Sequence, residues 1–314
     1  MNQKTKYLVV IAGPTAVGKT KLGIELAKHY NSIVISADSR QFYKELTIGT
    51  AKPSESELSE VKHHFINNKN ITELFGAGHF EKEAIPLLDG LFKEHQLVFV
   101  VGGSGLYIDA LLNGVDEFED VPIEVREKLN AELNEKGIEP LQNELKEKDP
   151  AYAAKVDIHN SQRVIRALEV CRHSGKPYSS FLKKNQTERN FTPIKLFINT
   201  DREQLYQKIN LRVDNMMKQG LLNEVKKLTT FKNVNALKTV GYKELFDHLE
   251  GACTLEEAIV KIKQHTRNYA KRQITWFKNP AYPAYRTGKQ NEWENFEPND
   301  LEKIKAFLDI IISN

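Results

Sequence analysis

Apolar and polar residues along the first third of the chain form blocks that predict strands and helices in turn. Three short runs rich in Val, Ile and Leu are typical of buried strands: Tyr7–Ala12, Ser32–Ser36 and Leu97–Val101. Helix-period stretches follow these runs at Lys19–Tyr30, His79–His95 and Ser104–Leu112. This alternation predicts a parallel sheet with helices on both faces. In such sheets ligands bind at the carboxyl ends of the strands.

The strand pattern stops at about Val121 and returns only at Ile194–Ile198. Between them, an acidic helix-period stretch, Ile123–Lys148, and a further helix, Asn160–His173, predict an all-helical insertion. Helices are expected after residue 200: Glu203–Gln219, Leu221–Thr230, Leu255–Phe277 and Asp300–Ile312. Pro280 and Pro283 are expected to end the long helix before them. We therefore predict an α/β core in residues 1–120 and 190–314, with the insertion in 121–189.

The composition is that of an ordinary globular protein. With 314 residues, 40% of them hydrophobic and 28% charged, the chain can hold two domains. No apolar run approaches the ~20 residues that span a membrane, and we expect no signal peptide because the first strand begins so early. Two cysteines without metal-type spacing, Cys171 and Cys253, indicate a reducing cytoplasm.

The charge is distributed unevenly, although its net value is only +3. Residues 116–149 hold twelve Asp or Glu and five Lys or Arg, whereas residues 258–290 hold eight Lys or Arg and no acid. This distribution favours an anionic partner near the basic end of the chain.

Residues 13–20 follow the first strand and match the phosphate-binding pattern G-x-x-x-x-G-K-[ST]. Gly13 and Gly18 allow backbone angles that turn successive N–H groups toward one anion, and the next helix adds its positive N-terminal end. Lys19 supplies a positive charge, and Thr20 offers a hydroxyl to Mg²⁺. The whole loop is expected to bind a phosphate or pyrophosphate: Gly13, Pro14, Thr15, Ala16, Val17, Gly18, Lys19 and Thr20. The core is accordingly predicted to be P-loop NTPase-like.

Two further segments end strands at the same edge of the predicted sheet. Asp38 follows the second strand, where a carboxylate beside a bound pyrophosphate can accept a proton, or can simply cap a turn. Gln41 carries a donor and an acceptor that suit an adenine edge. The segment Gly102–Tyr107 resembles a second anion-receiving loop with Ser104 as N-cap, although a tight strand-to-helix turn explains it equally well.

Three basic patches lie outside the predicted core sheet. They contain Arg163 with Arg166, the segment Lys238–Lys243, and a stripe of Lys263, Arg267 and Lys271 with Tyr269 and Trp276 nearby. Each alone is more often a solvated face, but together they favour a nucleic-acid backbone as partner. Without the last patch a nucleotide kinase would be the default, yet no apolar strand ends in a Walker-B aspartate.

In their order and spacing these motifs resemble the bacterial tRNA dimethylallyltransferases, which prenylate N6 of adenosine 37 beside the anticodon. The resemblance covers nearly the whole chain and rests on eight segments: Gly13–Thr20, Asp38–Gln41, Ile48–Pro53, Gly102–Tyr107, Gln162–Val170, Arg212–Met216, Val240–Tyr242 and Lys271–Trp276. It departs at Ser104, where the family usually has threonine. The cysteine–histidine finger of the eukaryotic relatives is absent from the sequence.

The resemblance implies that dimethylallyl diphosphate places its pyrophosphate in the phosphate loop, with Mg²⁺ held through Thr20. Lys19 and Arg212 would stabilise the leaving group, and Asp38 would take the proton of the adenine amine; the expected catalytic residues are thus Asp38, Thr20 and Lys19. The insertion would grip the anticodon stem. The implied tRNA contacts are Asp38, Ser39, Arg40, Gln41, Ser104, Arg126, Gln162, Arg163, Val164, Ile165, Arg166, Lys238, Thr239, Val240, Gly241, Tyr242, Lys243, Lys271, Arg272, Gln273, Ile274, Thr275, Trp276, Phe277 and Lys278.

Three hypotheses stay open at this point. The chain prenylates tRNA; or it prenylates free AMP or is a P-loop small-molecule kinase; or it binds RNA in a nucleotide-dependent way without catalysis. The basic helix and the insertion argue against the second, because a small substrate needs neither. Asp38 beside a complete phosphate loop argues against the third. We expect tRNA and dimethylallyl diphosphate as partners, no membrane, and a monomer.

Overall fold

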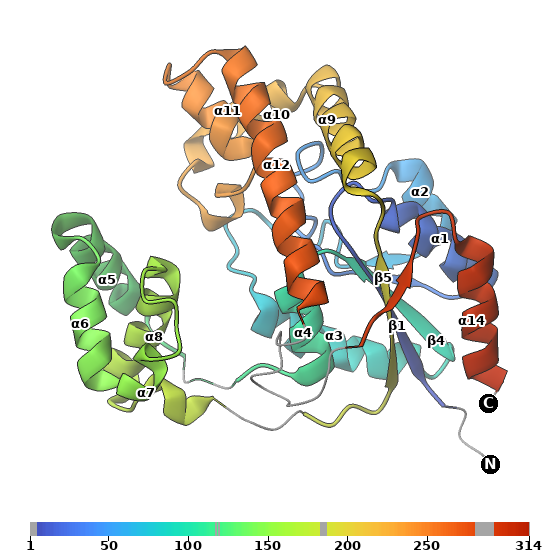
Figure 1. Cartoon of the computed structure of the whole chain (residues 1–314), viewed down its shortest axis with the longest axis horizontal. Helices are drawn as coiled ribbons and strands as arrows, with labels where there is room; N and C mark the ends of the chain where they lie inside the picture. Colours follow the sequence, from blue (N-terminus) through green and yellow to red (C-terminus); the bar gives the residue numbers. More distant parts are fainter. Residues whose placement is uncertain (1–4, 117, 119, 183–186, 280–291, 314) are drawn as a thin grey trace. The chain divides into compact units, whose positions relative to one another are not determined.

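The computed structural model describes residues 5–116, 118, 120–182, 187–279 and 292–313. The chain divides into two compact units (Figure 1), Met1–Gly114 with Thr187–Asn314, and Val115–Gln186. We call the first the α/β unit and the second the helical unit. Each is described by itself.

A six-stranded sheet forms the centre of the α/β unit, in the order β3-β2-β4-β1-β5-β6. Every neighbouring pair is parallel, so the predicted parallel sheet is confirmed. The strands are β1 Tyr7–Ala12, β2 Val34–Ser36, β3 His63–His64, β4 Leu97–Gly102, β5 Thr192–Ile198 and β6 Glu294–Phe296. Because β1 and β4 are buried along their whole length, both read as continuous apolar runs. The edge strands β3 and β6 were not predicted, because two or three residues carry no recognisable period.

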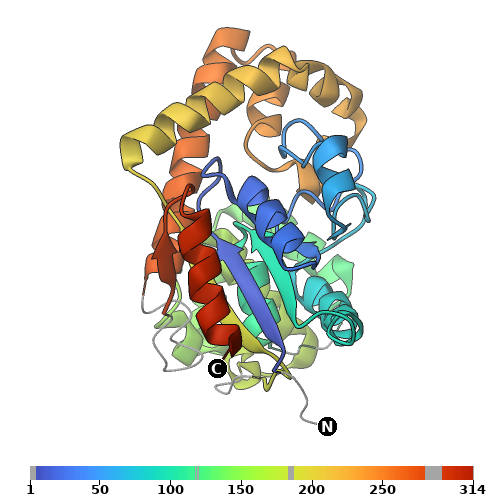
Figure 2. The same ribbon diagram turned by 90° about the vertical axis from the view of Figure 1, so that its right-hand side faces the viewer.

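Helices cover both faces of this sheet. The helices α1 and α14 lie side by side on one face, and α3 and α4 cover the other (Figures 1 and 2). The helices of the unit are α1 Lys19–His29, α2 Glu55–Glu60, α3 Ala77–Leu91, α4 Gly105–Asn113, α9 Arg202–Lys218, α10 Leu221–Lys227, α11 Tyr242–Leu249, α12 Leu255–Lys278 and α14 Leu301–Ser313. The long basic helix thus ends at Lys278, and the proline break expected at 280–283 lies outside the described residues.

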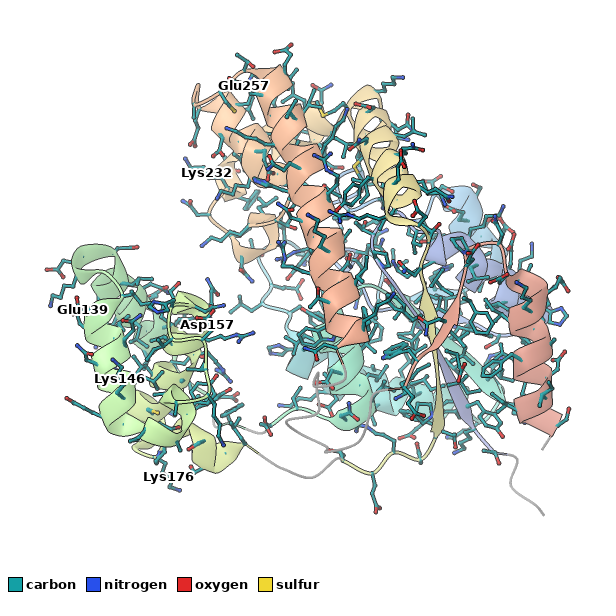
Figure 3. All side chains as sticks on the ribbon, in the orientation of Figure 1. Glu139, Lys146, Asp157, Lys176, Lys232 and Glu257 are labelled. Atoms are coloured by element: carbon teal, nitrogen blue, oxygen red, sulfur yellow. The ribbon has the colours of Figure 1, made fainter. Side chains whose placement is uncertain are left out.

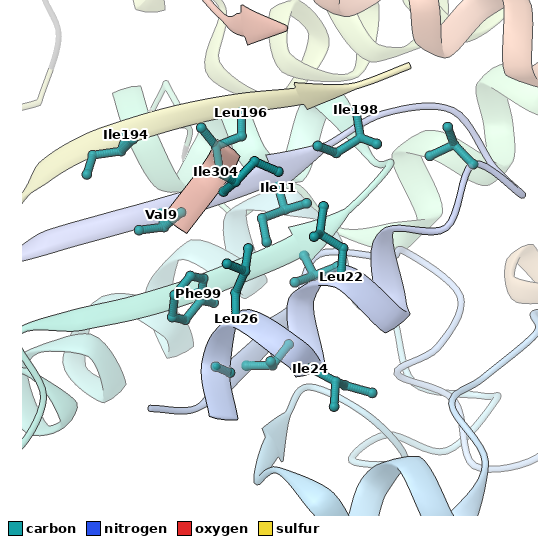
Figure 4. Packing of buried hydrophobic residues seen from close by; sticks show 14 of the residues in the cluster. Val9, Ile11, Leu22, Ile24, Leu26, Phe99, Ile194, Leu196, Ile198 and Ile304 are labelled. Carbon is teal, nitrogen blue, oxygen red and sulfur yellow. The ribbon is translucent and has the colours of Figure 1, made fainter. Parts of the chain in front are cut away.

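The main apolar core lies between the sheet and the helices α1 and α14 (Figure 4). Ile11 and Phe99 of the sheet pack with Leu22 and Leu26 of α1, and Ile304 of α14 joins them. All five side chains are at most 2% exposed, and each such burial contributes about 1.5–3 kcal/mol. This packing fixes the end of β1 against the start of α1, and the phosphate loop joins these two elements.

A second core gathers the helices that follow β5. Val225 of α10, Tyr242 and Leu245 of α11 and Ile262 of α12 pack together with Leu46 from the segment after β2. This core therefore anchors both the N-terminal part of α12 and the loop around residue 48.

The helical unit contains α5 Ile123–Lys136, α6 Glu139–Lys148, α7 Pro150–Ala153 and α8 Ser161–Ser174. Its apolar core joins Leu129, Leu145 and Leu168 of three helices. The stretch Ile123–Lys148 is broken in two at Gly137, whose φ of +75° favours glycine. Exposed acids and bases of α6, such as Glu139 and Lys146, extend away from this core (Figure 3).

Candidate active site

The phosphate loop connects β1 to α1 at the carboxyl edge of the sheet. Its conformation requires two glycines, since Gly13 has φ +155° and Gly18 has φ +112°. A Cβ on Gly13 would also lie 2.3 Å from the carbonyl oxygen of Ile198, at the end of β5. The Lys19 ammonium donates to the carbonyl oxygen of Pro14 at 2.7 Å, which closes the loop on itself.

The charged groups around this loop alter the protonation of Lys19. Burial, followed by the positive charge of Arg212, lowers the pKa of Lys19 to about 7, while the negative charge of Asp38 opposes the shift. Burial also lowers the pKa of Arg212, again opposed by Asp38. Two cations that are desolvated together make the loop a favourable place for a multiply charged anion.

One cavity is lined by four of the predicted pyrophosphate-binding residues and by all three predicted catalytic residues. Its lining includes Thr15, Lys19, Thr20, Asp38 and Arg212. Arg212 comes from α9, far away in the sequence, and its Nη1 donates to the hydroxyl of Thr15 at 3.4 Å. Of the other loop residues, Val17 is 1% exposed and packs into the main core, so its side chain serves the fold.

The donor set of this cavity fits Mg²⁺ bound mainly through a substrate. Among the described residues, no group of three or more His, Cys, Asp or Glu could hold a metal ion by itself. Thr20 and Asp38, however, line the same cavity and offer hydroxyl and carboxylate oxygens. Mg²⁺ is commonly held in proteins by one or two such oxygens together with phosphate oxygens.

Asp38 lies in the turn after β2, where its Oδ1 accepts the Arg40 N–H at 3.0 Å. The neighbouring Ser39 N–H donates to the hydroxyl of Ser104 at 2.9 Å. Ser104 is the N-cap residue of α4, as expected, but its side chain makes no capping bond. Its hydroxyl instead fastens the Asp38 turn to the loop after β4.

The glycines after β4 have a use that the sequence did not indicate. A Cβ on Gly103 would lie 2.2 Å from Nε2 of Gln273, and one on Gly105 would lie 2.1 Å from Nε1 of Trp276. Both partners belong to α12. The loop therefore needs glycines to receive two side chains of the basic helix, a reason independent of any anion.

Gln41 is buried and points into the protein. Its Oε1 accepts from the Ser36 hydroxyl at 3.1 Å, and its Nε2 donates to the carbonyl oxygens of Thr50 and Ala51 at 3.3 Å each. It still lines the cavity beside Asp38. In this structure, however, the amide that was expected to face adenine is occupied by internal bonds.

Glu224 of α10 holds the loop that receives Gln41, and sequence reasoning missed it. Its carboxylate accepts the backbone N–H groups of Thr47, Ile48 and Gly49 at 3.1, 2.8 and 3.0 Å. It also accepts the Tyr242 hydroxyl at 2.6 Å. Burial, with the charge of Glu224, raises the pKa of Tyr242. The same loop packs closely on Tyr242, because a Cβ on Gly49 would lie 2.6 Å from the Tyr242 ring.

A second cavity, with basic side chains around it, adjoins the phosphate cavity. Both are lined by Thr15, Asp38, Arg212 and Tyr269. The second cavity adds four cationic side chains: Arg40, Lys238, Lys243 and Arg272. Thr239, Val240 and Gly241 line it as well, whereas Tyr242 is fully buried in the second core. Tyr242 therefore supports this wall and cannot offer its side chain to RNA.

The expected RNA-binding stretch of α12 divides into an exposed and a buried set. Lys271, Arg272, Thr275 and Lys278 are exposed. The inward-facing residues pack into the protein: Gln273, Ile274, Trp276 and Phe277. These four cannot act as freely exposed RNA contacts, because they hold α12 to the rest of the unit.

The predicted stripe of Lys263, Arg267 and Lys271 faces α9. Lys263 forms an ion pair with Asp214 at 2.6 Å, and Arg267 donates to Asn210 at 2.7 Å. Lys271 lies 6.0 Å from the ring centre of Tyr206. Periodicity could not reveal this, because the partners are on another helix.

In the helical unit, a buried carboxylate organises the predicted arginines. Glu169, 3% exposed, accepts a hydrogen bond from Arg166 and lies 3.6 Å from Arg126. Gln162 and Arg163 are exposed on the first turn of α8, and Arg166 also covers the ring of Phe118. Val164 and Ile165 are at most 3% exposed in the core of the unit, so their side chains serve packing and not RNA contact.

A parallel sheet, a phosphate loop between β1 and α1 and a carboxylate after β2 define the chain as a P-loop enzyme of the α/β class. The model of the IPP transferase family matches residues 41–280. The chain therefore belongs to the IPP transferase family, and the predicted resemblance to prenyl-transferring enzymes is confirmed. No helix in the described part of the chain is long and apolar enough to cross a membrane.

Individual relatives agree with this assignment. The tRNA dimethylallyltransferase of Flavobacterium psychrophilum is 52% identical over 87% of this chain and 91% of its own. The solved tRNA isopentenylpyrophosphate transferase of Bacillus halodurans is 36% identical, with a TM-score of 0.70, over 98% of this chain and 97% of its own. A eukaryotic dimethylallyltransferase solved acting on tRNA is 28% identical, with a TM-score of 0.83, over 99% of this chain and 80% of its own.

Proposed function

We propose that this chain transfers a dimethylallyl group from dimethylallyl diphosphate to N6 of adenosine 37 in tRNA, with release of pyrophosphate. One observation carries the proposal. The cavity on the phosphate loop and the cavity with basic walls adjoin each other, and Asp38 lines both. A diphosphate in the first and a nucleobase entering from the second would meet beside this carboxylate.

The diphosphate side of the reaction uses the phosphate loop. The C1–O bond of the prenyl diphosphate breaks, and the departing pyrophosphate keeps the electron pair. Lys19 and Arg212, which line the phosphate cavity, would stabilise that charge together with loop N–H groups. Such preorganised electrostatic stabilisation is usually the largest contribution to catalysis. Thr20, with diphosphate oxygens, would hold Mg²⁺, which would neutralise part of the same charge.

The acceptor side uses the turn after β2. As the C1–N6 bond forms, the proton of the adenine amine passes to the Asp38 carboxylate, which the Arg40 N–H holds in place at 3.0 Å. Adenosine 37 must leave its stack to reach this point, as in other enzymes that act on a base. The base, once it fills the cavity, would exclude water from the reacting carbon.

Exposed and half-buried polar side chains, most of them cationic, would supply the grip on RNA. In the α/β unit these are Arg40, Lys238, Lys243, Lys271, Arg272 and Lys278. In the helical unit Arg126, Gln162, Arg163 and Arg166 would hold the anticodon stem through its phosphates. The monomeric state and the cytoplasmic location stay predictions.

Two tRNA transcripts that differ only at position 37 test the proposal. The enzyme is incubated with dimethylallyl diphosphate, Mg²⁺ and each transcript, and the nucleosides are then analysed by mass spectrometry. Modified adenosine is expected only from the transcript with adenosine 37. Equal modification of a transcript with guanosine 37 would show that the acceptor is another nucleotide. If neither transcript were modified, the protein would lack the proposed activity.

A further inference from the structure

One side chain in the expected RNA-binding stretch of α12 is bound to the catalytic loops at both ends. Gln273 is only 6% exposed. Its Oε1 accepts the Thr15 N–H of the phosphate loop at 2.8 Å, and its Nε2 donates to the Gly103 carbonyl oxygen at 2.9 Å. The amide therefore connects the loop after β1 to the loop after β4.

We propose that Gln273 is a positioning residue that holds the phosphate loop in its anion-binding shape, and not a contact to RNA. The inference rests on the proposed function, since it assigns a role within the same site. Gln273 also lines the phosphate cavity, and we assign its effect to the two hydrogen bonds that hold Thr15 and Gly103.

The chemistry of the two partners requires an amide at this position. The Thr15 N–H needs an acceptor and the Gly103 carbonyl needs a donor, and a glutamine side chain offers one of each. The space is equally specific, because a Cβ on Gly103 would lie 2.2 Å from Nε2 of Gln273. A residue larger than glycine at position 103 would therefore have to displace the Gln273 amide.

The hydrogen bonds to Thr15 fix the shape of the phosphate loop. Thr15 is held from two sides, through its N–H by Gln273 and through its hydroxyl by Arg212 at 3.4 Å. The next residue, Ala16, has φ +65°, a left-handed conformation that costs about 1–2 kcal/mol for a residue with a Cβ. The bonds to Thr15 offset this strain, so the later N–H groups of the loop face the anion before it arrives. The Thr15 N–H itself is occupied.

Isosteric variants separate this role from RNA contact. Gln273→Glu keeps the acceptor for Thr15 but places an oxygen against the Gly103 carbonyl, and Gln273→Met removes both bonds. Gln264→Glu, at an exposed position of the same helix, is the matched control. Calorimetry with magnesium pyrophosphate and filter binding of tRNA without prenyl donor measure the two affinities separately. Thermal melts establish that each variant is folded.

We expect pyrophosphate affinity to fall about tenfold in Gln273→Glu and at least as much in Gln273→Met, since one or two hydrogen bonds are removed. The KM for dimethylallyl diphosphate should rise in parallel, with tRNA affinity within about twofold of the control. Weaker tRNA binding with unchanged pyrophosphate affinity would overturn the proposal. Pyrophosphate binding is read without tRNA, so failure of tRNA prenylation in the wild type would be recognised separately.

A double-mutant cycle gives an independent check. Gly103→Ala should weaken pyrophosphate binding in the wild type, because the new methyl group displaces Gln273. In a Gln273→Ala background the same change should cost much less, since Nε2 is gone and only the Gly13 carbonyl at 3.2 Å remains close. Fully additive losses would show that the two residues act independently, against the proposal.

Discussion

Replacing Glu224 with glutamine should destabilise the α/β unit and loosen the cavity wall beside Asp38. Oε2 of Glu224 accepts two backbone N–H groups, and Oε1 accepts the Gly49 N–H and the Tyr242 hydroxyl. An amide must turn its NH₂ toward one of these pairs. The orientation that costs less free energy points the NH₂ at Tyr242, because the tyrosine hydroxyl can accept a hydrogen bond in place of donating one. The Gly49 N–H then loses its acceptor.

The magnitude follows from the hydrogen bonds that the substitution removes. Hydrogen bonds to a charged group contribute about 1.5–3 kcal/mol each, so losing one and weakening the others should cost about 3 kcal/mol. For a unit of this size that is a fall in Tm of about 6–12 °C. Tyr242→Phe removes a single bond and should cost about half as much.

Far-UV circular dichroism melts measure these shifts, with Glu94→Gln at an exposed position as control. Gln41 donates to the carbonyls of Thr50 and Ala51 in the same loop, so activity measured at low temperature should fall as well. A Tm within about 2 °C of the control would show that Glu224 does not stabilise the unit, because four bonds to one carboxylate cannot be that weak. Losses from the Glu224 and Tyr242 variants that add without coupling would show that the two residues act independently.

Three further predictions concern the chemistry and the RNA. Asp38→Asn should lower kcat about 10²–10⁴-fold, which is the usual contribution of a general base, while tRNA affinity in filter binding stays unchanged. A normal kcat would show that Asp38 is not the base. Changing Lys271 and Arg272 to Ala should weaken tRNA binding. The slope of log K against log salt should fall by about 0.7 for each phosphate that the protein no longer neutralises. An unchanged slope would show that these two side chains face solvent and do not contact RNA. Because the pKa of Lys19 is lowered to about 7, its ammonium deprotonates as the pH rises through neutrality, so affinity for sulfate, whose charge is constant, should fall between pH 6 and 8. Lys19→Met should abolish this dependence, and a pH-independent wild type would contradict the lowered pKa.

Much of the fold could be predicted because its elements carry their own signals. The fully buried β1 and β4 are continuous apolar runs, and the phosphate loop depends on eight consecutive residues. Strands β3 and β6 could not be found, because two or three residues become a strand only by pairing with a neighbour.

The site residues that were misread depend on hydrogen bonds between distant segments. Gln273 binds a residue 258 positions away, and Glu224 binds residues 175 to 177 positions away. A signal for Gln273 did exist, since it lies between Ala270 and Phe277 on the buried face of α12. A polar residue on such a face needs internal partners, and the sequence cannot say where they are.

The proposed activity is tested most directly by offering the enzyme its alternative substrates together. The protein is mixed with labelled dimethylallyl diphosphate and Mg²⁺ in the presence of unmodified tRNA, AMP and ATP, and the label is followed into each product. We expect label in tRNA alone, with ATP intact. Label in AMP would show that the chain is a small-molecule prenyltransferase. Hydrolysis of ATP without prenyl transfer would show that the phosphate loop serves a kinase or NTPase reaction.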